Sequence, residues 1–503
     1  MNQRKAGAVL SYVSFFISNI AGILYTPVML RLMGQSEYGL YGTAGSLTSY
    51  LSLLSFGIGG AYLRYNARCR AQNDLEGEHR LNGAFLMIFS ILSALVLICG
   101  AGMIAFAEVL VEDTFTAYEM RRMQIIMALG ITNMVITFLF NTVTMALQAY
   151  ERYIFIRVVH LIAGICAPIA NIIALYSGGR AVALSVMSLT ISILCYIVYL
   201  VYALKVLHFR MSFRGIQFSF LKELFIFSSF LFLNSITDQI TNATDNVILS
   251  AVSGTTAVAV YTVGANFRTY FMNFSTSISS VFSPRINAIV AAGDGDGELD
   301  RLFIRVGRIQ FYILSLILIG YISIGQDFIC LWAGADYSQS FPIGLVLILA
   351  VFVPLFQNVG LEIQKAKNKH KARSIVYLII ALANVLMTIP LAKRWGGIGA
   401  ALATMICMFA GNAVFMNWYY AKHIHLDIRG FWKSIVSILP SYILPCAVGF
   451  AVNRFWVLDS YWDILLSAAL ITAVFILSIW LFSMNPYEKD LIVKPIRKLL
   501  NHK

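Results

Sequence analysis

Several polar residues interrupt the apolar run between residues 224 and 249, and four of them, two of which are carboxylic acids, are spaced as on one helix face. These four are Asn234, Asp238, Asn242 and Asp245. Their spacing of 4, 4 and 3 residues brings successive side chains to one face of an α-helix. An ionisable side chain within such an apolar helix is costly, and it typically faces a water-filled cavity, the interior of a bundle or a partner charge. The pattern predicts a polar helix face with two acidic groups.

The following apolar run, 256–283, contains one basic residue, Arg268. At 1.5 Å per residue, Arg268 and Asp238 both lie roughly 18 Å below the same end of their helices. We expect Arg268 to bind an anionic group, with Asp238 and Asp245 accepting a coupling ion, H⁺ or Na⁺. The alternative is a structural ion pair between neighbouring helices, which would also account for charges at this depth.

Two other arginines are weaker candidates for contact with an anion. Arg31 ends the first apolar run, where a long side chain can also reach back to the interface. Arg64 lies at the inner end of the second run, where it could meet an anionic headgroup or serve as an ordinary cytoplasmic charge.

Several kinds of chemistry are excluded by what the sequence lacks. No Gly-Lys dipeptide occurs, so the phosphate-binding loop of nucleotide hydrolases is absent. The acidic stretch 294–300 has Arg305 where a calcium loop needs its bidentate glutamate. The seven cysteines lack the spacing of a metal site. We therefore expect no catalytic residue, no metal and no cofactor.

The elements that carry these residues must be membrane helices. The chain has 503 residues, of which 59% are hydrophobic and 12% charged, against about 25% charged in ordinary globular proteins. A membrane-spanning helix needs about 20 apolar residues. Fourteen such runs occur, at 7–30, 40–63, 82–107, 123–149, 157–177, 181–204, 224–249, 256–283, 307–331, 341–363, 374–392, 398–421, 434–453 and 464–484.

The basic residues predict the orientation of these helices. If both termini are cytoplasmic, 29 of the 37 Lys and Arg residues fall in cytoplasmic segments and seven on the opposite side. This is the bias of the positive-inside rule, and it explains most of the net charge of +13 without a nucleic-acid partner. The longest loop is expected around residues 284–308, which leaves no room for a soluble catalytic domain.

The two halves of the chain resemble each other at an offset of about 220 in the numbering, as an internal repeat would. Gly34 and Tyr41 recur as Gly254 and Tyr261, and the segment starting at Gly178 recurs at Gly396. The repeat spans six helices, so both copies have the same orientation in the membrane. We expect an all-α polytopic protein with six-helix bundles at 1–210 and 211–425, two appended helices at 426–485 and a basic cytoplasmic tail at 486–503.

The sequence resembles a known family of transporters. The opening segment with Pro27, Arg31, Gly34 and Tyr41, and the motifs YTVGANF at 261–267, SPRI at 283–286 and WAGADY at 332–337, are similar to the Wzx polysaccharide-repeat flippases of the multidrug/oligosaccharidyl-lipid/polysaccharide (MOP) exporter superfamily. The resemblance implies translocation of an undecaprenyl-diphosphate-linked oligosaccharide across the bacterial cytoplasmic membrane by alternating access. Arg268 would bind the headgroup, with hydrogen-bond donors at Asn234, Asn242, Asn266 and Asn273.

The resemblance also suggests partners and leaves alternatives. Membrane lipids surround the protein, and a polysaccharide polymerase and a chain-length regulator are expected partners in surface polysaccharide synthesis. The two aspartates on one helix would equally suit a cation-coupled multidrug exporter of the same superfamily. An exporter of another lipid-linked precursor is a further alternative. A membrane-embedded glycosyltransferase or polymerase would need larger outer loops than this chain has.

Overall fold

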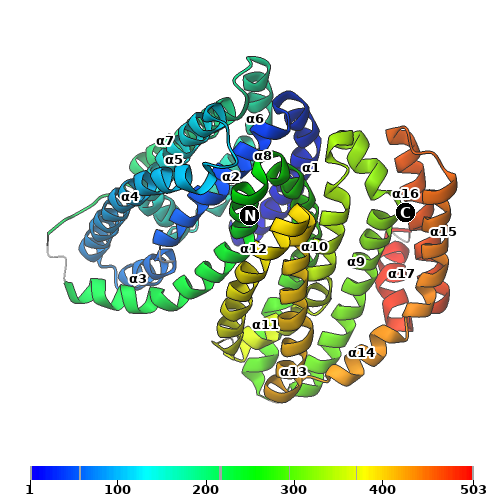
Figure 1. Ribbon diagram of the computed structural model, residues 1–503. Helices are drawn as coiled ribbons and strands as arrows, with labels where there is room; N and C mark the ends of the chain where they lie inside the picture. Colours follow the sequence, from blue (N-terminus) through cyan, green and yellow to red (C-terminus); the bar gives the residue numbers. More distant parts are fainter. Residues whose placement is uncertain (1–2, 56–57, 215–217, 294, 370, 501–503) are drawn as a thin grey trace. The chain divides into compact units, whose positions relative to one another are not determined.

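The computed structural model describes residues 3–55, 58–214, 218–293, 295–369 and 371–500, with the backbone alone for some helical positions, among them 3–16, 218–234, 242 and 495–500. Within these ranges every regular element is helical (Figure 1). The α-helices are α1 (Gln3–Met33), α2 (Gln35–Ser49), α3 (Gly59–Ala71), α4 (Leu75–Val111), α5 (Ala117–Ala149), α6 (Tyr153–Tyr176), α7 (Arg180–Val206), α8 (Phe218–Ala292), α9 (Asp296–Trp332), α10 (Ser340–Phe356), α11 (Asn358–Ala366), α12 (Lys371–Met408), α13 (Met416–Tyr419), α14 (Ile428–Val436), α15 (Ile443–Phe455), α16 (Tyr461–Phe482) and α17 (Pro486–Leu500).

The helices account for all fourteen predicted runs. Ten helical stretches of the described chain are long and apolar enough to cross a membrane. Two of these stretches contain an interior break, at Gly254 in α8 and at Gly396 in α12, and each therefore makes two passes. The first two predicted runs are α1 and the segment from α2 through the 3₁₀ turn Tyr50–Ser55 to α3. The prediction of an all-α polytopic membrane protein is confirmed.

The predicted boundaries are wrong in two respects. Pro284 does not begin a long loop, because α8 continues to Ala292 and α9 begins at Asp296. The runs 40–63 and 434–453 are not single helices, since 3₁₀ turns interrupt both, at Tyr50–Ser55 and at Leu439–Tyr442. Hydropathy measures how apolar a segment is and does not detect such a local change in helix type.

The backbone repeats the conformation of its turns along the chain. Twelve described residues have φ in the left-handed region, which is favourable for glycine and uncommon for other residues. Ten of the twelve form pairs in chain order at a nearly constant offset. These pairs are Gly34 with Gly254, Asn73 with Gly293, Glu151 with Asn368, Gly178 with Gly396, and His208 with His425. The internal repeat predicted from a few small residues is thus also present in the backbone conformation of the turns that separate the helices.

The chain forms two compact units, one made of residues up to Val260 with Ala392–Gly397 and the other of Tyr261–Leu391 with Ile398–Lys503. The core of the first unit is aromatic, with the rings of Tyr62 and Phe85 edge to face at 5.0 Å. In the second unit Phe303 stacks on Phe431 at 4.5 Å. The predicted bundle boundary at residue 210 differs from this division and stays a prediction.

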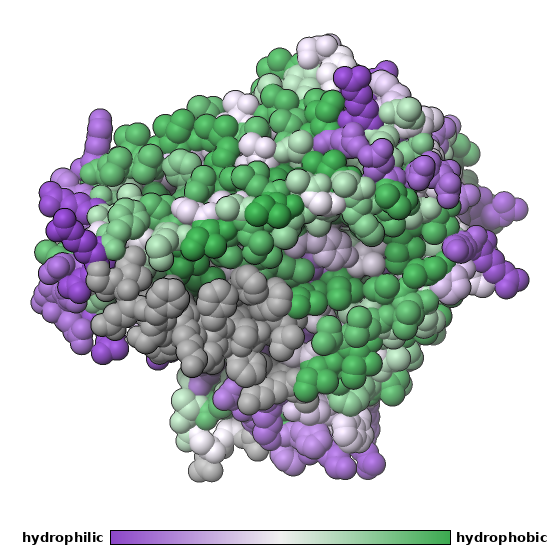
Figure 2. All heavy atoms as spheres, turned by 60° about the vertical axis from the view of Figure 1, so that its left-hand side comes forward, coloured by the Kyte–Doolittle hydropathy of each residue, from purple (hydrophilic) through white to green (hydrophobic). Residues whose placement is uncertain are grey.

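Large apolar side chains also cover much of the outside of the helices. In the first unit α4, α6 and α7 expose residues such as Ile98, Phe106, Ile173 and Leu194 by more than half of their surface. Figure 2 shows apolar residues over much of one face, with hydrophilic residues gathered toward its margins. Water would not stabilise such a surface, whereas lipid does.

Candidate functional site

The polar middle of α8 packs against α2 within the first unit. Asn246 donates to the Ser46 hydroxyl at 3.0 Å. Further along the two segments, Gln239 bonds Ser49, and Thr244 bonds the Tyr50 hydroxyl. Gln239 meets Ser49 whereas Asn246 meets Ser46, so the two segments run antiparallel. These polar side chains of α8 therefore join two helices, and a role in binding is not needed to explain them.

The two aspartates of α8 lie in different surroundings. Asp238 is exposed, whereas Asp245 is buried with 4% of its surface accessible. Asp245 neighbours Thr244 in the contact with α2. The side chains of Asn234 and Asn242 lie outside the described residues. Of the four residues of the predicted polar face, only the two aspartates can therefore be placed.

Arg268 is buried in the second unit, with 7% of its surface accessible. It lies in the part of α8 that follows the break at Gly254. Asn266 and Asn273 flank it along the helix and are half-buried. A buried guanidinium in a membrane helix needs negatively charged or polar groups as partners. Asp238 belongs to the other unit, and its pairing with Arg268 stays a prediction.

The two remaining predicted arginines lie in helices α1 and α3 of the first unit. Arg31 is in the last turn of α1, and Arg64 is in α3. Both side chains are exposed, as a side chain must be if it is to meet a headgroup at an interface.

A buried ion pair joins α2 to α5. The Arg122 Nε lies 2.6 Å from the Glu37 carboxylate, and Glu37 is only 3% exposed. The same carboxylate accepts from the Ala181 amide at 3.3 Å, and Arg122 donates to the Gly179 carbonyl at 3.1 Å. The α6–α7 turn is thereby fixed to the starts of α2 and α5. In the predicted topology this is the outer end of the unit.

A second carboxylate at the same end connects α5 to both α2 and the break in α8. Glu119 Oε1 accepts a hydrogen bond from the Ser36 hydroxyl at 2.6 Å and one from the Thr255 hydroxyl at 3.0 Å. Beside it, Thr114 donates to the Ser250 carbonyl at 2.8 Å. We call these five residues, Ser36, Thr114, Glu119, Ser250 and Thr255, the outer clasp. It joins the first helices of one repeat to the glycine break that opens the other.

The capping box at the N-terminus of α5 orients Glu119 for this contact. Thr116 caps α5, and the Glu119 side chain accepts a hydrogen bond from the Thr116 amide at 3.0 Å, which completes a capping box. One carboxylate oxygen is thus fixed locally while the other meets α2 and α8. The Thr-x-x-Glu spacing could have shown the cap in sequence, but the two distant hydroxyls could not be predicted from it.

The second unit contains a buried charge network that the sequence also did not reveal. Arg308 on α9 binds both carboxylate oxygens of Glu488 on α17, at 2.6 and 3.0 Å. It also donates to the Ser483 carbonyl and to the Ser434 hydroxyl. Both charged residues are buried. This network connects α9, α14 and the C-terminal helix.

A neutral polar cluster lies inside the second unit between the two parts of α12. Asn384 donates to the Thr404 hydroxyl at 2.9 Å and accepts from the Thr388 hydroxyl at 2.8 Å. All three residues are buried. Because α12 reverses at Gly396, side chains from its two parts meet, and their polar groups are satisfied within the apolar interior.

These features define the class of the protein as a multi-pass membrane protein built from repeated helical bundles, with few charges and a small number of them buried. Residues 28–342, more than half of the chain, match the polysaccharide biosynthesis protein family. The chain belongs to this family.

Similar proteins are found by sequence and by structure. The chain is 20% identical over 418 residues to the probable flippase AglR of Haloferax volcanii, with 82% of each protein covered. Its fold resembles that of the lipid II flippase MurJ in the inward closed conformation, at a TM-score of 0.73 and 16% identity over 96% of this chain and 100% of that one. An inward-facing multidrug resistance MATE family transporter of the MOP superfamily matches at a TM-score of 0.63 and 13% identity, with 83% and 95% covered.

Proposed function

We propose that this protein is a flippase that moves a lipid-linked oligosaccharide from the cytoplasmic to the outer leaflet of the membrane, for the synthesis of a surface polysaccharide. The observation that supports it most is membership of the polysaccharide biosynthesis protein family, combined with a fold that resembles a lipid flippase over nearly the whole chain. More specifically, we propose that the substrate is an undecaprenyl-diphosphate-linked repeat unit in the bacterial cytoplasmic membrane. Both termini of the protein would lie in the cytoplasm.

The chemistry of such a substrate agrees with the charged residues of the chain. A diphosphate is bound by cations and hydrogen-bond donors, and Arg268 is a buried cation of α8. The exposed Arg31 and Arg64 would meet the headgroup at the two interfaces, while Asn266 and Asn273 would bind its sugars. The lipid tail would remain in the bilayer, where the apolar faces of α4, α6 and α7 lie.

The outer clasp supports alternating access in this proposal. It fastens α5 to α2 and to the break in α8 through single hydroxyl and carboxylate contacts. Such contacts are each worth about 1–3 kcal/mol, small enough to open during a transport cycle. Release of the substrate to the outer leaflet would require Glu119 to leave Thr255, with Gly254 as the point where the chain can bend.

Arg268→Ala tests the proposed contact with the diphosphate. We expect at least a tenfold loss of transport, because a phosphate contact in a low-dielectric site contributes more than one charged hydrogen bond. The measurement is restoration of surface polysaccharide in a strain that lacks its repeat-unit flippase, with the amount of protein in the membrane determined alongside. Arg285→Ala is the matched control, since this arginine of the same helix is exposed. Full activity of the Arg268 variant would contradict its assigned role.

Asp238→Asn tests ion coupling. A carboxylate that takes up H⁺ or Na⁺ in each cycle cannot be replaced by an amide, so we expect transport to lose its dependence on pH or on Na⁺ while substrate binding persists. The same strain is assayed at several pH values and Na⁺ concentrations, and Asp245→Asn distinguishes the exposed aspartate from the buried one. Unchanged transport with unchanged pH and Na⁺ dependence in both variants would mean that neither aspartate couples transport to an ion.

A cation-coupled multidrug exporter is the second candidate, favoured by the two aspartates of α8 and by the fold likeness to a MATE transporter. Vesicles that contain the protein separate the two functions. Extrusion of a fluorescent organic cation, together with failure to restore polysaccharide, would favour the exporter. The turns between helices on the predicted outer side are short, which favours a transporter over a membrane-embedded glycosyltransferase.

A further inference from the structure

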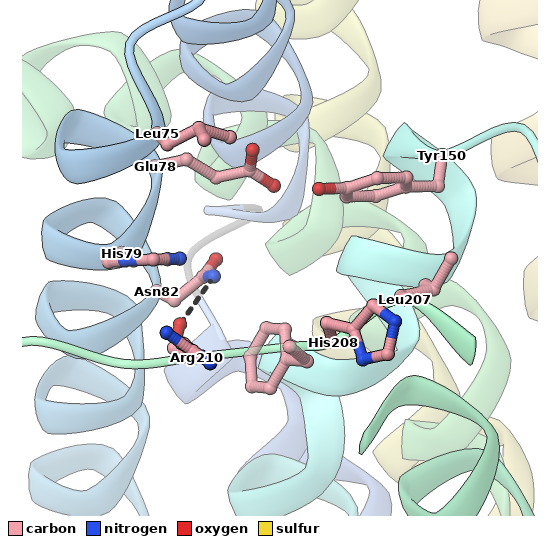
Figure 3. Close-up of a pocket in the computed structure, with 9 residues that line it drawn as sticks. Leu75, Glu78, His79, Asn82, Tyr150, Leu207, His208 and Arg210 are labelled. Atoms are coloured by element: carbon pink, nitrogen blue, oxygen red, sulfur yellow. Dashed lines mark hydrogen bonds between the residues drawn. The ribbon is translucent and has the colours of Figure 1, made fainter. Parts of the chain in front are cut away.

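A cavity of about 220 Å³ lies at one end of the first unit, away from Asp238 and Asp245 in the sequence and in the helices that form it. The positive-inside count assigns this end to the cytoplasm. The start of α4, the residue that ends α5 and the segment after α7 surround the cavity (Figure 3). Its lining is Leu75, Glu78, His79, Asn82, Tyr150, Leu207, His208, Phe209 and Arg210.

Glu78 is the buried charge of this cavity, with 5% of its surface exposed. The Asn66 amide donates to its carboxylate at 3.2 Å, and the Tyr150 hydroxyl points toward it across the cavity (Figure 3). Burial, followed by the contact with Glu78, raises the pKa of Tyr150 to about 12. The phenol therefore keeps its proton at neutral pH and donates it to the carboxylate.

Two neighbouring arginines are engaged elsewhere. Arg70 lies over the Tyr150 ring at 4.3 Å and donates to the Ala149 carbonyl at 2.7 Å. Arg80 pairs with the exposed Glu76. The lining also includes two histidines and the exposed Arg210. In the described part of the chain, Glu78 thus forms no ion pair with an arginine or lysine.

Two of the polar hydrogens near Glu78 are used in hydrogen bonds to other groups. Tyr62 donates its hydroxyl hydrogen to Asn82 at 2.7 Å, and Asn82 donates to the Arg210 carbonyl at 2.9 Å. These two donors are thereby used. The Asn66 Oδ1 is buried and accepts no hydrogen bond from the described residues. The buried carboxylate in the cavity wall and the buried amide oxygen of the residue bonded to it both require a positive charge or a donor.

We propose that this cavity binds a small monovalent cation, either an alkali-metal ion or an ammonium group, against the Glu78 carboxylate. One carboxylate balances one positive charge, and the Tyr150 oxygen in the lining is a hard ligand of the kind that such ions prefer. A divalent metal fits less well, because the described residues contain no group of three or more His, Cys, Asp or Glu that could hold one. The bound cation would join α4 to the end of α5.

The experiment measures the melting temperature of the full-length purified protein at constant ionic strength and constant neutral pH. N-methyl-D-glucamine chloride is replaced stepwise by NaCl, KCl, NH₄Cl or methylammonium chloride. A ligand that binds only the folded state raises the melting temperature in a saturable way, by about 2 °C for a chain of this size. Comparing the four salts distinguishes an alkali-metal site from an ammonium site.

Glu78→Gln should melt at the same temperature in all four salts, because the amide keeps the shape of the side chain and removes its charge. Glu298→Gln is the control, since this glutamate is exposed and has its own partner in Arg285 at 2.8 Å. If Glu78→Gln does not fold, Tyr150→Phe should raise the cation concentration of half-saturation several-fold. A wild-type melting temperature that is equal in all cations, or salt dependence that survives in the Glu78 variant, would overturn the proposal.

Discussion

Glu488→Ala should destabilise the second unit by about 3–5 kcal/mol, the usual cost of leaving one member of a buried ion pair alone. Arg308 and Glu488 are 8% and 3% exposed, so water cannot replace the missing carboxylate. The guanidinium would retain the Ser434 and Ser483 contacts but would carry an uncompensated charge. The measurement is thermal unfolding of the purified protein in detergent, where we expect a fall of about 5 °C or more.

Two further variants test whether the expected loss of stability comes from the uncompensated buried charge of Arg308. Glu298→Ala removes the carboxylate of an exposed pair, Arg285–Glu298, and should cost less than about 1 kcal/mol. The double variant Arg308→Met with Glu488→Leu should recover most of the loss, because it removes both buried charges and keeps the volume. If Glu488→Ala melts at the same temperature as the unchanged protein, the pair does not hold α17 in place.

The helices and their breaks were predictable because they follow from short-range properties of the chain. Apolar length marks the membrane passes, and the positions of Gly34, Gly178, Gly254 and Gly396 mark turns that a side chain would strain. Where helix type changes without a change in hydropathy, as at Tyr50–Ser55, the same reasoning gives one continuous helix.

The partners of buried charges were not predictable from one sequence. Arg308 and Glu488 are 180 residues apart, and the sequence alone marks each of them only as part of a cytoplasmic segment. Periodicity states which face of a helix a residue occupies and not which distant residue it meets. Arg268 is buried, while its depth in the membrane and its role in binding stay predictions.

Gly39→Ala should prevent the close approach of α2 to the segment of α8 that follows its break. A Cβ at Gly39 would lie 1.9 Å from the Thr255 carbonyl oxygen and 2.6 Å from its carbon. Both atoms belong to the backbone, so no side-chain rotation relieves the clash, and the two segments must move apart. Overpacking of this kind costs about 1–3 kcal/mol, and it would pull Thr255 away from Glu119 in the outer clasp.

The expected result is a population shift away from the state in which the clasp is closed, by a factor of about 10 for each 1.4 kcal/mol. It can be measured by disulfide formation between cysteines introduced at Ser46 and Asn246, whose side chains are hydrogen-bonded at 3.0 Å, in a protein whose native cysteines are replaced. Gly39→Ala should slow this cross-link at least tenfold and reduce transport.

Gly45→Ala is the matched control, because it adds the same methyl group to the same helix where no atom lies within 4 Å. It should leave both cross-linking and transport unchanged. Equal cross-linking rates in the two variants would mean that α2 and α8 do not need the Gly39 contact to stay together. A slower cross-link with normal transport would mean that opening this contact does not limit the transport cycle. The outer clasp would then have no role in the proposed alternating access.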